Sequence, residues 1–451
     1  MSETTRPRRV LIVTYVFPPV GGAGVQRSAK FVKYLPGFGW HGSVLTASNP
    51  SVPVHDASLS ADLPDDTLIR RARTLEPSYE VKNLISTGGD TPVSGVARLP
   101  SWAKGAARSV VSKLLQPDPQ VLWYPAAVKE GRLLLKSVPH DAVLATGPPF
   151  SCFLVAAALS RRTGLPLVLD YRDEWELTNR FQENKRFGPI TQGLNRFMEH
   201  RIARMARVIL ATSDASARSL EAMRDRCGGR APVHCIRNGF DPDDFTGDWP
   251  ARDTTPERRY RLVYTGTLFS QTSVKPLVVA IEQLCLKAPS LGAHLEVVFA
   301  GRRTADQDAL LGRLSGLPVE VTLYPYLDHT AAVGLMRSAD LLCSILADAP
   351  GAARALTAKV FEYMAARRPI LAITPPGDLW DVLEDYPAAD RFLPSDVSGI
   401  AACLVRRIEA RQSGAAEPSI VWDGTRYDRR EQSRALAGVL SEIVRRPLGG
   451  C

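Results

Sequence analysis

The 451-residue sequence predicts an α/β protein of two doubly wound domains, each a parallel sheet with helices on both faces. Three observations support this fold class. The chain is longer than the roughly 250–300 residues that one hydrophobic core serves. Continuous apolar runs alternate with helical segments, which is typical of parallel strands buried on both faces. A polar stretch at 246–260, with a proline inside it, separates two such series and is expected to be a linker.

The first domain is expected to span residues 1–245 and to begin with a βαβ unit. An apolar strand at 10–14 leads into a glycine-rich loop, a helix at 25–35 and a second strand at 43–46. Further strands are expected at 141–146, 166–170, 208–212 and 233–236, and further helices at 151–162, 189–206 and 215–226.

The second domain is expected to span residues 261–424, with a last helix in the segment 425–451. Its strands are expected at 261–265, 295–300, 319–323, 341–346 and 370–373, and its helices at 276–287 and 330–337. Two open sheets of this kind leave a cleft at the carboxyl ends of their strands, where ligands of α/β proteins bind.

The composition indicates a globular protein with an anionic ligand. Apolar residues make up 45% and charged residues 23%, and the formal net charge is +9. The seven cysteines form no C-x-x-C pair and no histidine stands at zinc-finger spacing, so we expect no metal site and a reducing compartment. The N-terminus lacks the features of a signal peptide and no run approaches a membrane span, so we expect a cytoplasmic protein.

Residues 102–116 have the pattern of a basic amphipathic helix. Apolar side chains on one side face Lys104, Arg108 and Lys113 on the other. An ordinary surface helix explains the pattern. Peripheral attachment to an anionic membrane surface, on the inner face of the membrane, is the alternative and stays open.

The loop that follows the first strand contains Gly22 and Gly24 and opens a helix. This geometry can hold an anion on main-chain N–H groups, although a tight turn also needs glycine. A dinucleotide-binding fingerprint is disfavoured because Arg27 occupies its third glycine position and residues 43–48 contain no acidic side chain.

Polar residues follow strands in both halves. In the second half, Gly266, Thr267 and Arg302 follow strands and Lys275 lies shortly after, a set that suits a diphosphate. In the first half, Asp170, Arg172 and Asp173 end a buried strand, and a carboxylate there could orient or deprotonate a sugar hydroxyl. A structural Asp–Arg pair is the alternative for these three. The sequence Asp-Pro-Asp at 241–243 is interpreted as a turn and not as a metal site.

Residues 357–373 form a loop, a helix, a basic turn and a buried strand. Lys359 and Glu362 stand three residues apart in the first turn of that helix and therefore share a face. A cation for phosphate beside a carboxylate for sugar hydroxyls describes a nucleotide-sugar pocket. A solvated ion pair is the alternative for the two residues taken alone.

Together these motifs resemble the retaining glycosyltransferases of family 4, which have the GT-B fold of two Rossmann-like domains. The resemblance covers nearly the whole chain, and it rests on PPVGGAGVQR (18–27), TGPPFS (146–151), DYRDEW (170–175), RNGFDP (237–242), YTGTL (264–268) and TAKVFEYMAARRPILAI (357–373).

The resemblance implies that the N-terminal domain binds the acceptor, the C-terminal domain binds the donor, and the last helix crosses back to the N-terminal domain. Glu362 would hold the ribose hydroxyls, and Lys275 and Lys359 would contact the diphosphate. The expected catalytic residues are Asp173, Lys275, Lys359 and Glu362. The expected donor-binding residues are Gly22, Gly24, Gly266, Thr267, Arg302, Lys359 and Glu362, and the expected acceptor-binding residues are Asp170, Arg172 and Asp173. No metal or other cofactor is implied.

One position departs from the family pattern, which has two glutamates eight positions apart. Arg354 stands where the first of them belongs, and Asp348 is a nearby acid that could substitute for it. The sequence therefore predicts transfer of a sugar from a nucleotide-sugar to a glycan or lipid-linked acceptor, in cell-surface polysaccharide or glycolipid synthesis. A sugar-nucleotide epimerase of the same fold and a non-catalytic glycosyltransferase-like partner are the alternatives. A nucleic-acid binder is disfavoured because no aromatic-basic motif is present.

Overall fold

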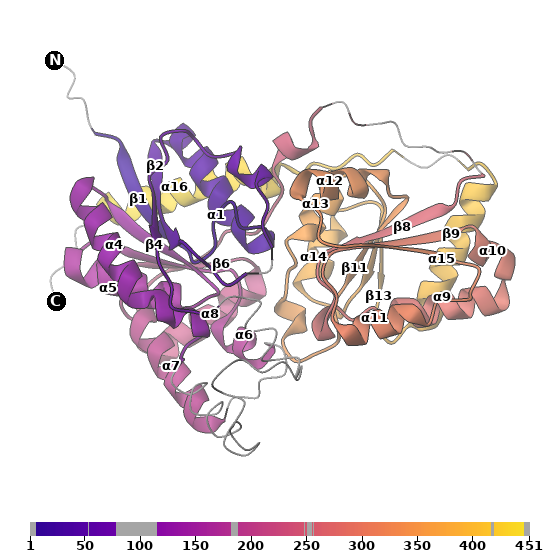
Figure 1. Cartoon of the computed structure of the whole chain (residues 1–451), viewed down its shortest axis with the longest axis horizontal. Coiled ribbons are helices and arrows are strands. Elements are labelled where there is room, and N and C mark those ends of the chain that lie inside the picture. The colour runs from indigo at the N-terminus through magenta and orange to yellow at the C-terminus, as the bar shows by residue number, and fades with distance from the viewer. Residues whose placement is uncertain are drawn as a thin grey trace, which may run out of the picture. The chain divides into compact units, whose positions relative to one another are not determined.

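The computed structural model describes residues 6–52, 54–77, 115–181, 188–247, 249, 255, 257–415 and 419–445. These residues form two compact units, each built on one parallel sheet with helices on its faces (Figure 1). Unit 1 contains the described residues up to Arg237 together with those from Gln432 on, and unit 2 contains Asn238–Glu431. The predicted fold class of two doubly wound α/β domains is confirmed.

Unit 1 has a seven-stranded sheet in the order β3-β2-β1-β4-β5-β6-β7, and every strand pair is parallel. Its strands are β1 (Arg8–Val13), β2 (Trp40–Ala47), β3 (Ile69–Ala72), β4 (Ala142–Gly147), β5 (Leu167–Tyr171), β6 (Val208–Ala211) and β7 (Val233–Cys235). Its helices are α1 (Ala23–Tyr34), α4 (Tyr124–Ser137), α5 (Ser151–Thr163), α6 (Trp175–Phe181), α7 (Pro189–Ala203) and α8 (Asp214–Arg226).

Unit 2 has a six-stranded parallel sheet in the order β10-β9-β8-β11-β12-β13. Its strands are β8 (Tyr260–Thr265), β9 (Leu295–Ala300), β10 (Glu320–Tyr324), β11 (Leu341–Ile345), β12 (Ile370–Ile373) and β13 (Ala389–Phe392). Its helices are α9 (Lys275–Lys287), α10 (Pro289–Ala293), α11 (Ala305–Gly312), α12 (His329–Ser338), α13 (Lys359–Ala365), α14 (Asp378–Glu384) and α15 (Val397–Gln412).

The strand order places a switch point in each sheet, because the connections run in opposite directions from the two central strands. These strands are β1 and β4 in unit 1 and β8 and β11 in unit 2. Ligands of open α/β sheets bind at the carboxyl ends of such strands. The glycine loops that follow β1 and β8 therefore lie where the fold favours a ligand.

The last helix, α16 (Arg429–Arg445), begins in unit 2 and belongs to unit 1 from Gln432 on. Its apolar side chains Leu436, Leu440 and Ile443 join the core beneath α1 and β2. The Trp40 indole also donates to Ser441 Oγ at 3.0 Å. This packing returns the end of the chain to the first unit, as the fold class predicted.

The unit boundaries differ from the expected ones, which placed residues up to 245 in the first domain. The segment from Asn238 to Phe245 lies in unit 2 because Phe240 donates its N–H to the Tyr427 carbonyl at 3.0 Å and accepts from the Arg429 N–H at 3.0 Å. The expected amphipathic helix at 102–116 falls largely outside the described residues, and the expected linker at 246–260 falls partly outside them. Among the residues that are described, no helix has the length and apolar character to cross a membrane.

Candidate functional site

The strongest group of predicted site residues in unit 2 gathers around the Lys359 amine. Lys359 begins α13, and its Nζ donates to Tyr264 Oη at 3.2 Å and lies 4.4 Å from the centre of that ring. Tyr264 Oη donates to the Thr267 carbonyl at 3.0 Å. The amine therefore lies within the loop that follows β8, together with the predicted residues Gly266 and Thr267.

Glycine is required in this loop because the lysine occupies the space of a side chain. A Cβ on Gly266 would stand 1.9 Å from Lys359 Nζ, and the residue has a φ of +127° that favours glycine. A Cβ on Gly301 would stand 2.2 Å from the Gly266 carbonyl oxygen, so the loops after β8 and β9 meet through their main chains. The loops after these two neighbouring strands thus meet beside the Lys359 amine.

Burial lowers the pKa of the Lys359 ammonium, while nearby Tyr363 and Glu362 act to raise it. A cation that has lost much of its hydration gains more from an anionic ligand than a solvated one does. The Tyr363 hydroxyl accepts from the Thr265 N–H at 2.9 Å and ties α13 to the end of β8. The lysine charge is therefore fixed in place at the carboxyl ends of the strands.

Glu362 has different surroundings from Lys359. Its Oε1 lies 3.9 Å from His329 Nδ1, and the two side chains are 12% and 11% exposed. Among the described residues, Lys359 and Glu362 do not form an ion pair with each other. The interpretation of the two as a solvated pair is therefore wrong, although the donor-binding roles predicted for them stay predictions.

The remaining predicted residues of unit 2 lie outside these contacts. Arg302 follows Gly301, and its carbonyl accepts from the Leu268 N–H at 2.8 Å while its side chain is exposed. Lys275 is exposed at the start of α9. Arg354 ends a short 3-10 turn, and Asp348 is exposed in the loop after β11.

In unit 1, the Arg172 side chain contacts the predicted glycine loop. Its guanidinium donates to the Gly24 and Pro148 carbonyls, and a Cβ on Gly24 would stand 2.8 Å from Nη1. Gly22 precedes α1 with a φ of +106°, and in the part of the chain that the structure describes no side chain caps the start of this helix. The loop therefore keeps main-chain N–H groups available at the start of a twelve-residue helix.

Asp170 is a buried ionic partner and is not exposed to a ligand in unit 1. The side chains of Asp170 and Arg27 are 0% and 1% exposed, with an Nη2–Oδ1 distance of 2.8 Å. Thr146 Oγ1 also donates to Asp170 Oδ2 at 2.9 Å. Asp170 therefore has the structural role that the sequence left open, but its partner is Arg27 and not Arg172. Asp173, three positions on, is exposed.

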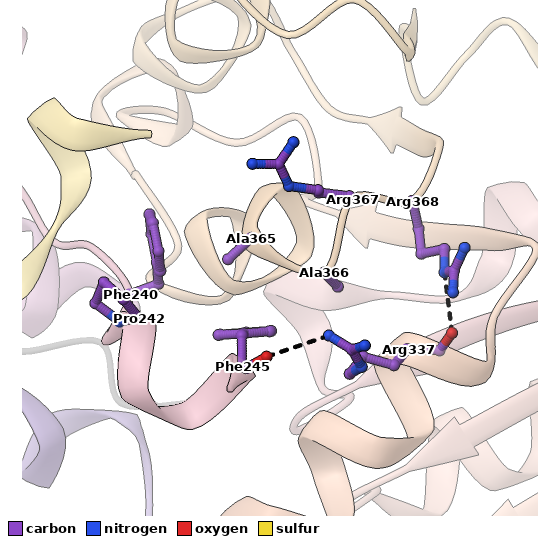
Figure 2. A pocket seen from close by; sticks show the side chains of 8 residues that line it. All are labelled: Phe240, Pro242, Phe245, Arg337, Ala365, Ala366, Arg367 and Arg368. Carbon is purple, nitrogen blue, oxygen red and sulfur yellow. Dashed lines mark hydrogen bonds between the residues drawn. The ribbon is translucent and has the colours of Figure 1, made fainter. Parts of the chain in front are cut away.

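A pocket of about 370 Å³ lies at the opposite end of α13 (Figure 2). It is lined by Phe240, Pro242, Phe245, Arg337, Ala365, Ala366, Arg367 and Arg368. Arg337 donates to the Phe245 carbonyl at 3.4 Å, Arg368 to the Arg337 carbonyl at 2.9 Å, and Arg367 to the Ile420 carbonyl at 3.1 Å. The guanidinium groups thus bind main-chain oxygens, two of them at helix ends, which is a structural role.

Tyr264, His329, Asp244 and Arg27 were not predicted as site residues. Tyr264 stands in the motif YTGTL (264–268), in which Gly266 and Thr267 were the predicted residues. His329 precedes Glu362 by 33 positions, and no local spacing links the two. Only the tertiary structure brings these partners together.

Residues 22–239 match the profile of the family described as "Glycosyl transferase 4-like domain". The chain carries a glycosyltransferase 4-like domain. The match begins at the glycine loop and covers the strands and helices of unit 1 from α1 to β7. The predicted enzyme class, glycosyltransferase, is confirmed at the level of this domain. A comparison of the sequence with curated proteins gives no match.

Solved structures similar to this glycosyltransferase-domain protein span almost its whole length. HepE of Anabaena in complex with UDP and glucose has a TM-score of 0.58 and 16% identity, over 96% of this chain and 100% of that one. UDP-forming α,α-trehalose-phosphate synthase from Burkholderia xenovorans has a TM-score of 0.57 and 16% identity, over 98% and 100%. An E. coli trehalose-6-phosphate structure bound with UDP-2-fluoro glucose has a TM-score of 0.60 and 12% identity, over 97% and 99%. At these identities the likeness shows the fold, GT-B.

Proposed function

We propose that this protein is a retaining glycosyltransferase that moves a sugar from a nucleoside-diphosphate sugar to a glycan or lipid-linked acceptor. The glycosyltransferase 4-like domain supports the reaction class. Solved structures of the same fold contain UDP, UDP-glucose or a UDP-sugar analogue, which supports a UDP-sugar as the donor. Cell-surface polysaccharide or glycolipid synthesis remains the pathway class that the resemblance suggests.

The position of the Lys359 amine is the observation that carries this proposal. This amine is a partly desolvated cation beside Gly266, at the carboxyl end of a switch-point strand. A cation in that position is suited to a diphosphate. Glu362 stands one turn further along the same helix, within reach of a ribose attached to that diphosphate.

In the proposed reaction, an acceptor hydroxyl oxygen forms a bond to the anomeric carbon while the bond from that carbon to the diphosphate oxygen breaks. The hydroxyl proton passes to the departing diphosphate, which leaves as the nucleoside diphosphate. Lys359 and the N–H groups of the loops would stabilise the negative charge that develops on the leaving group. Attack from the leaving-group face would retain the anomeric configuration.

Turnover of UDP-sugars tests the proposal. We expect that Lys359→Ala lowers UDP release from the preferred UDP-sugar at least ~100-fold, the scale of losing one transition-state donor. Lys287→Ala is the matched control, because Lys287 is exposed at the end of α9 in the same unit. Equal turnover of the wild type and the Lys359 variant would overturn the assignment of the site.

A second candidate function is a glycosyltransferase-like partner without turnover. Arg354 favours it, because a cation stands where the family has its first motif glutamate. This function predicts that UDP binds and that no UDP-sugar is turned over with any acceptor. UDP release by the wild type would exclude it.

A further inference from the structure

His329 lies between two carboxylates, and each ring nitrogen faces one of them. Nε2 is 2.9 Å from Asp244 Oδ2, which is hydrogen-bond distance. Nδ1 is 3.9 Å from Glu362 Oε1, which is an electrostatic contact longer than a hydrogen bond. The three side chains are only 11–15% exposed, so the contacts are poorly screened by water.

Asp244 anchors this arrangement to the chain segment that enters unit 2. It belongs to the 3-10 turn Pro242–Phe245, and the next residue accepts from Arg337 at the other end of α12. Arg430 also donates to Asp243 in the same turn. The 3-10 turn therefore contacts both ends of α12, through His329 at its start and Arg337 at its end. These contacts hold Asp244 in place as a partner for the His329 ring.

The Glu362 carboxylate needs such a partner because Lys359, the nearest cation in the sequence, contacts other groups. The Lys359 amine points to Tyr264 and Gly266, and α13 has only seven residues to restrain its side chains. The ring can donate through Nε2 to Asp244, and an imidazolium would also attract the Glu362 carboxylate electrostatically across the 3.9 Å from Nδ1. The anchored ring therefore favours a direction of the Glu362 carboxylate that faces Nδ1.

We propose that His329, anchored by Asp244, is a positioning residue that orients Glu362 toward the ribose hydroxyls of the donor nucleotide. This inference rests on the proposed function, which assigns the ribose to Glu362. It adds a histidine and an aspartate that act through Glu362 and do not touch the ligand. The link also joins the donor site to the segment that connects the two units.

Calorimetric titration with UDP and with 2′,3′-dideoxy-UDP tests the proposal. We expect that His329→Leu weakens UDP binding about ten-fold, the scale of one hydrogen bond to a charged group. The same variant should bind dideoxy-UDP as the wild type does, because that ligand lacks the hydroxyls that Glu362 would hold. A merely structural role for His329 would weaken both ligands equally, and that result would overturn the proposal.

Three further variants keep the test decisive. His329→Asn places an amide donor near the position of Nδ1 and should recover most of the UDP affinity. Asp244→Asn leaves the ring in place and should give a smaller loss in the same direction. His294→Leu, a change elsewhere in unit 2, should have no effect on binding.

Glu362→Gln separates this proposal from the proposed function. If Glu362→Gln weakens UDP binding and His329→Leu does not, the positioning role is overturned and the donor site stands. If Glu362→Gln and the wild type bind UDP equally, the assignment of the ribose to Glu362 fails, and the positioning role fails with it.

Discussion

At the scale of single residues, Lys359 and Glu362 take different partners although they stand one helical turn apart. The lysine contacts Tyr264 near the end of β8, and the glutamate lies close to His329 on α12. Each charge is thereby fixed at a separate point of one surface. In the proposed function, the phosphates of a nucleoside diphosphate would lie near Lys359 and its ribose hydroxyls near Glu362.

The ion pair of Arg27 with Asp170 gives a prediction at the same scale. Asp170→Asn leaves a guanidinium buried without its carboxylate, so we expect a loss of about 3 kcal/mol or more in the free energy of unfolding. Urea denaturation measures this loss. Asp65→Asn, at an exposed position of unit 1, should change the free energy by less than about 0.5 kcal/mol. Similar small changes in both variants would show that the pair does not stabilise unit 1.

At the scale of elements, helix α7 brings a carboxyl group into the interior of unit 1. Burial, followed by the charges of Glu176 and Glu174, raises the pKa of Glu199 from 4.5 to about 8. Between these two values the folded protein holds a proton that the unfolded chain releases. This contribution to stability is fully present below pH 4.5 and is lost as the pH rises through about 8.

We therefore predict that the free energy of unfolding of the wild type falls between pH 5 and pH 8 more steeply than that of Glu199→Gln. The amide cannot release a proton, so its contribution does not change over this range. Urea denaturation at several pH values, followed by tryptophan fluorescence, gives both slopes. Parallel slopes would contradict the raised pKa.

The elements that the sequence predicted well are the buried ones. Strands such as β1 and β11 are apolar on both faces and stand out as continuous runs. The edge strands β3 (IRRA) and β13 (ADRF) were missed, because each has a partner on one side only and carries charged side chains. Hydrophobic pattern alone cannot separate such strands from polar loops.

The candidate site, too, could be predicted from the sequence only in part. The glycines and Lys359 could be predicted, because a strand end followed by glycine has a local pattern. The partners of Lys359 and Glu362 could not, because Tyr264 is 95 positions from the lysine and His329 is on another helix. Arg172 was expected to meet the acceptor, and the structure places its guanidinium against the Gly24 and Pro148 carbonyls. The acceptor roles of Arg172 and Asp173 stay predictions, whereas the fully buried Asp170 side chain offers no surface to an acceptor in this structure.

At the scale of the whole molecule, the chain forms two parallel-sheet units, and its last helix belongs mainly to the first unit. The segments that connect the units pair with each other at Phe240 and Asp428. Most of the donor-site candidates, including Lys359 and Glu362, lie in unit 2, and the family match lies in unit 1 and the residues just after it. The proposed donor site should therefore be tested on the intact chain, with a measurement that reports on unit 2 specifically.

Calorimetric titration of the intact protein with UDP tests the central claim most directly. We expect that the wild type and Lys287→Ala bind UDP with the same affinity. We expect that Lys359→Ala binds UDP at least about ten-fold more weakly, because one hydrogen bond to a charged group is lost. Equal UDP affinity in all three proteins, or no binding by the wild type, would contradict the placement of a nucleotide-sugar site at Lys359.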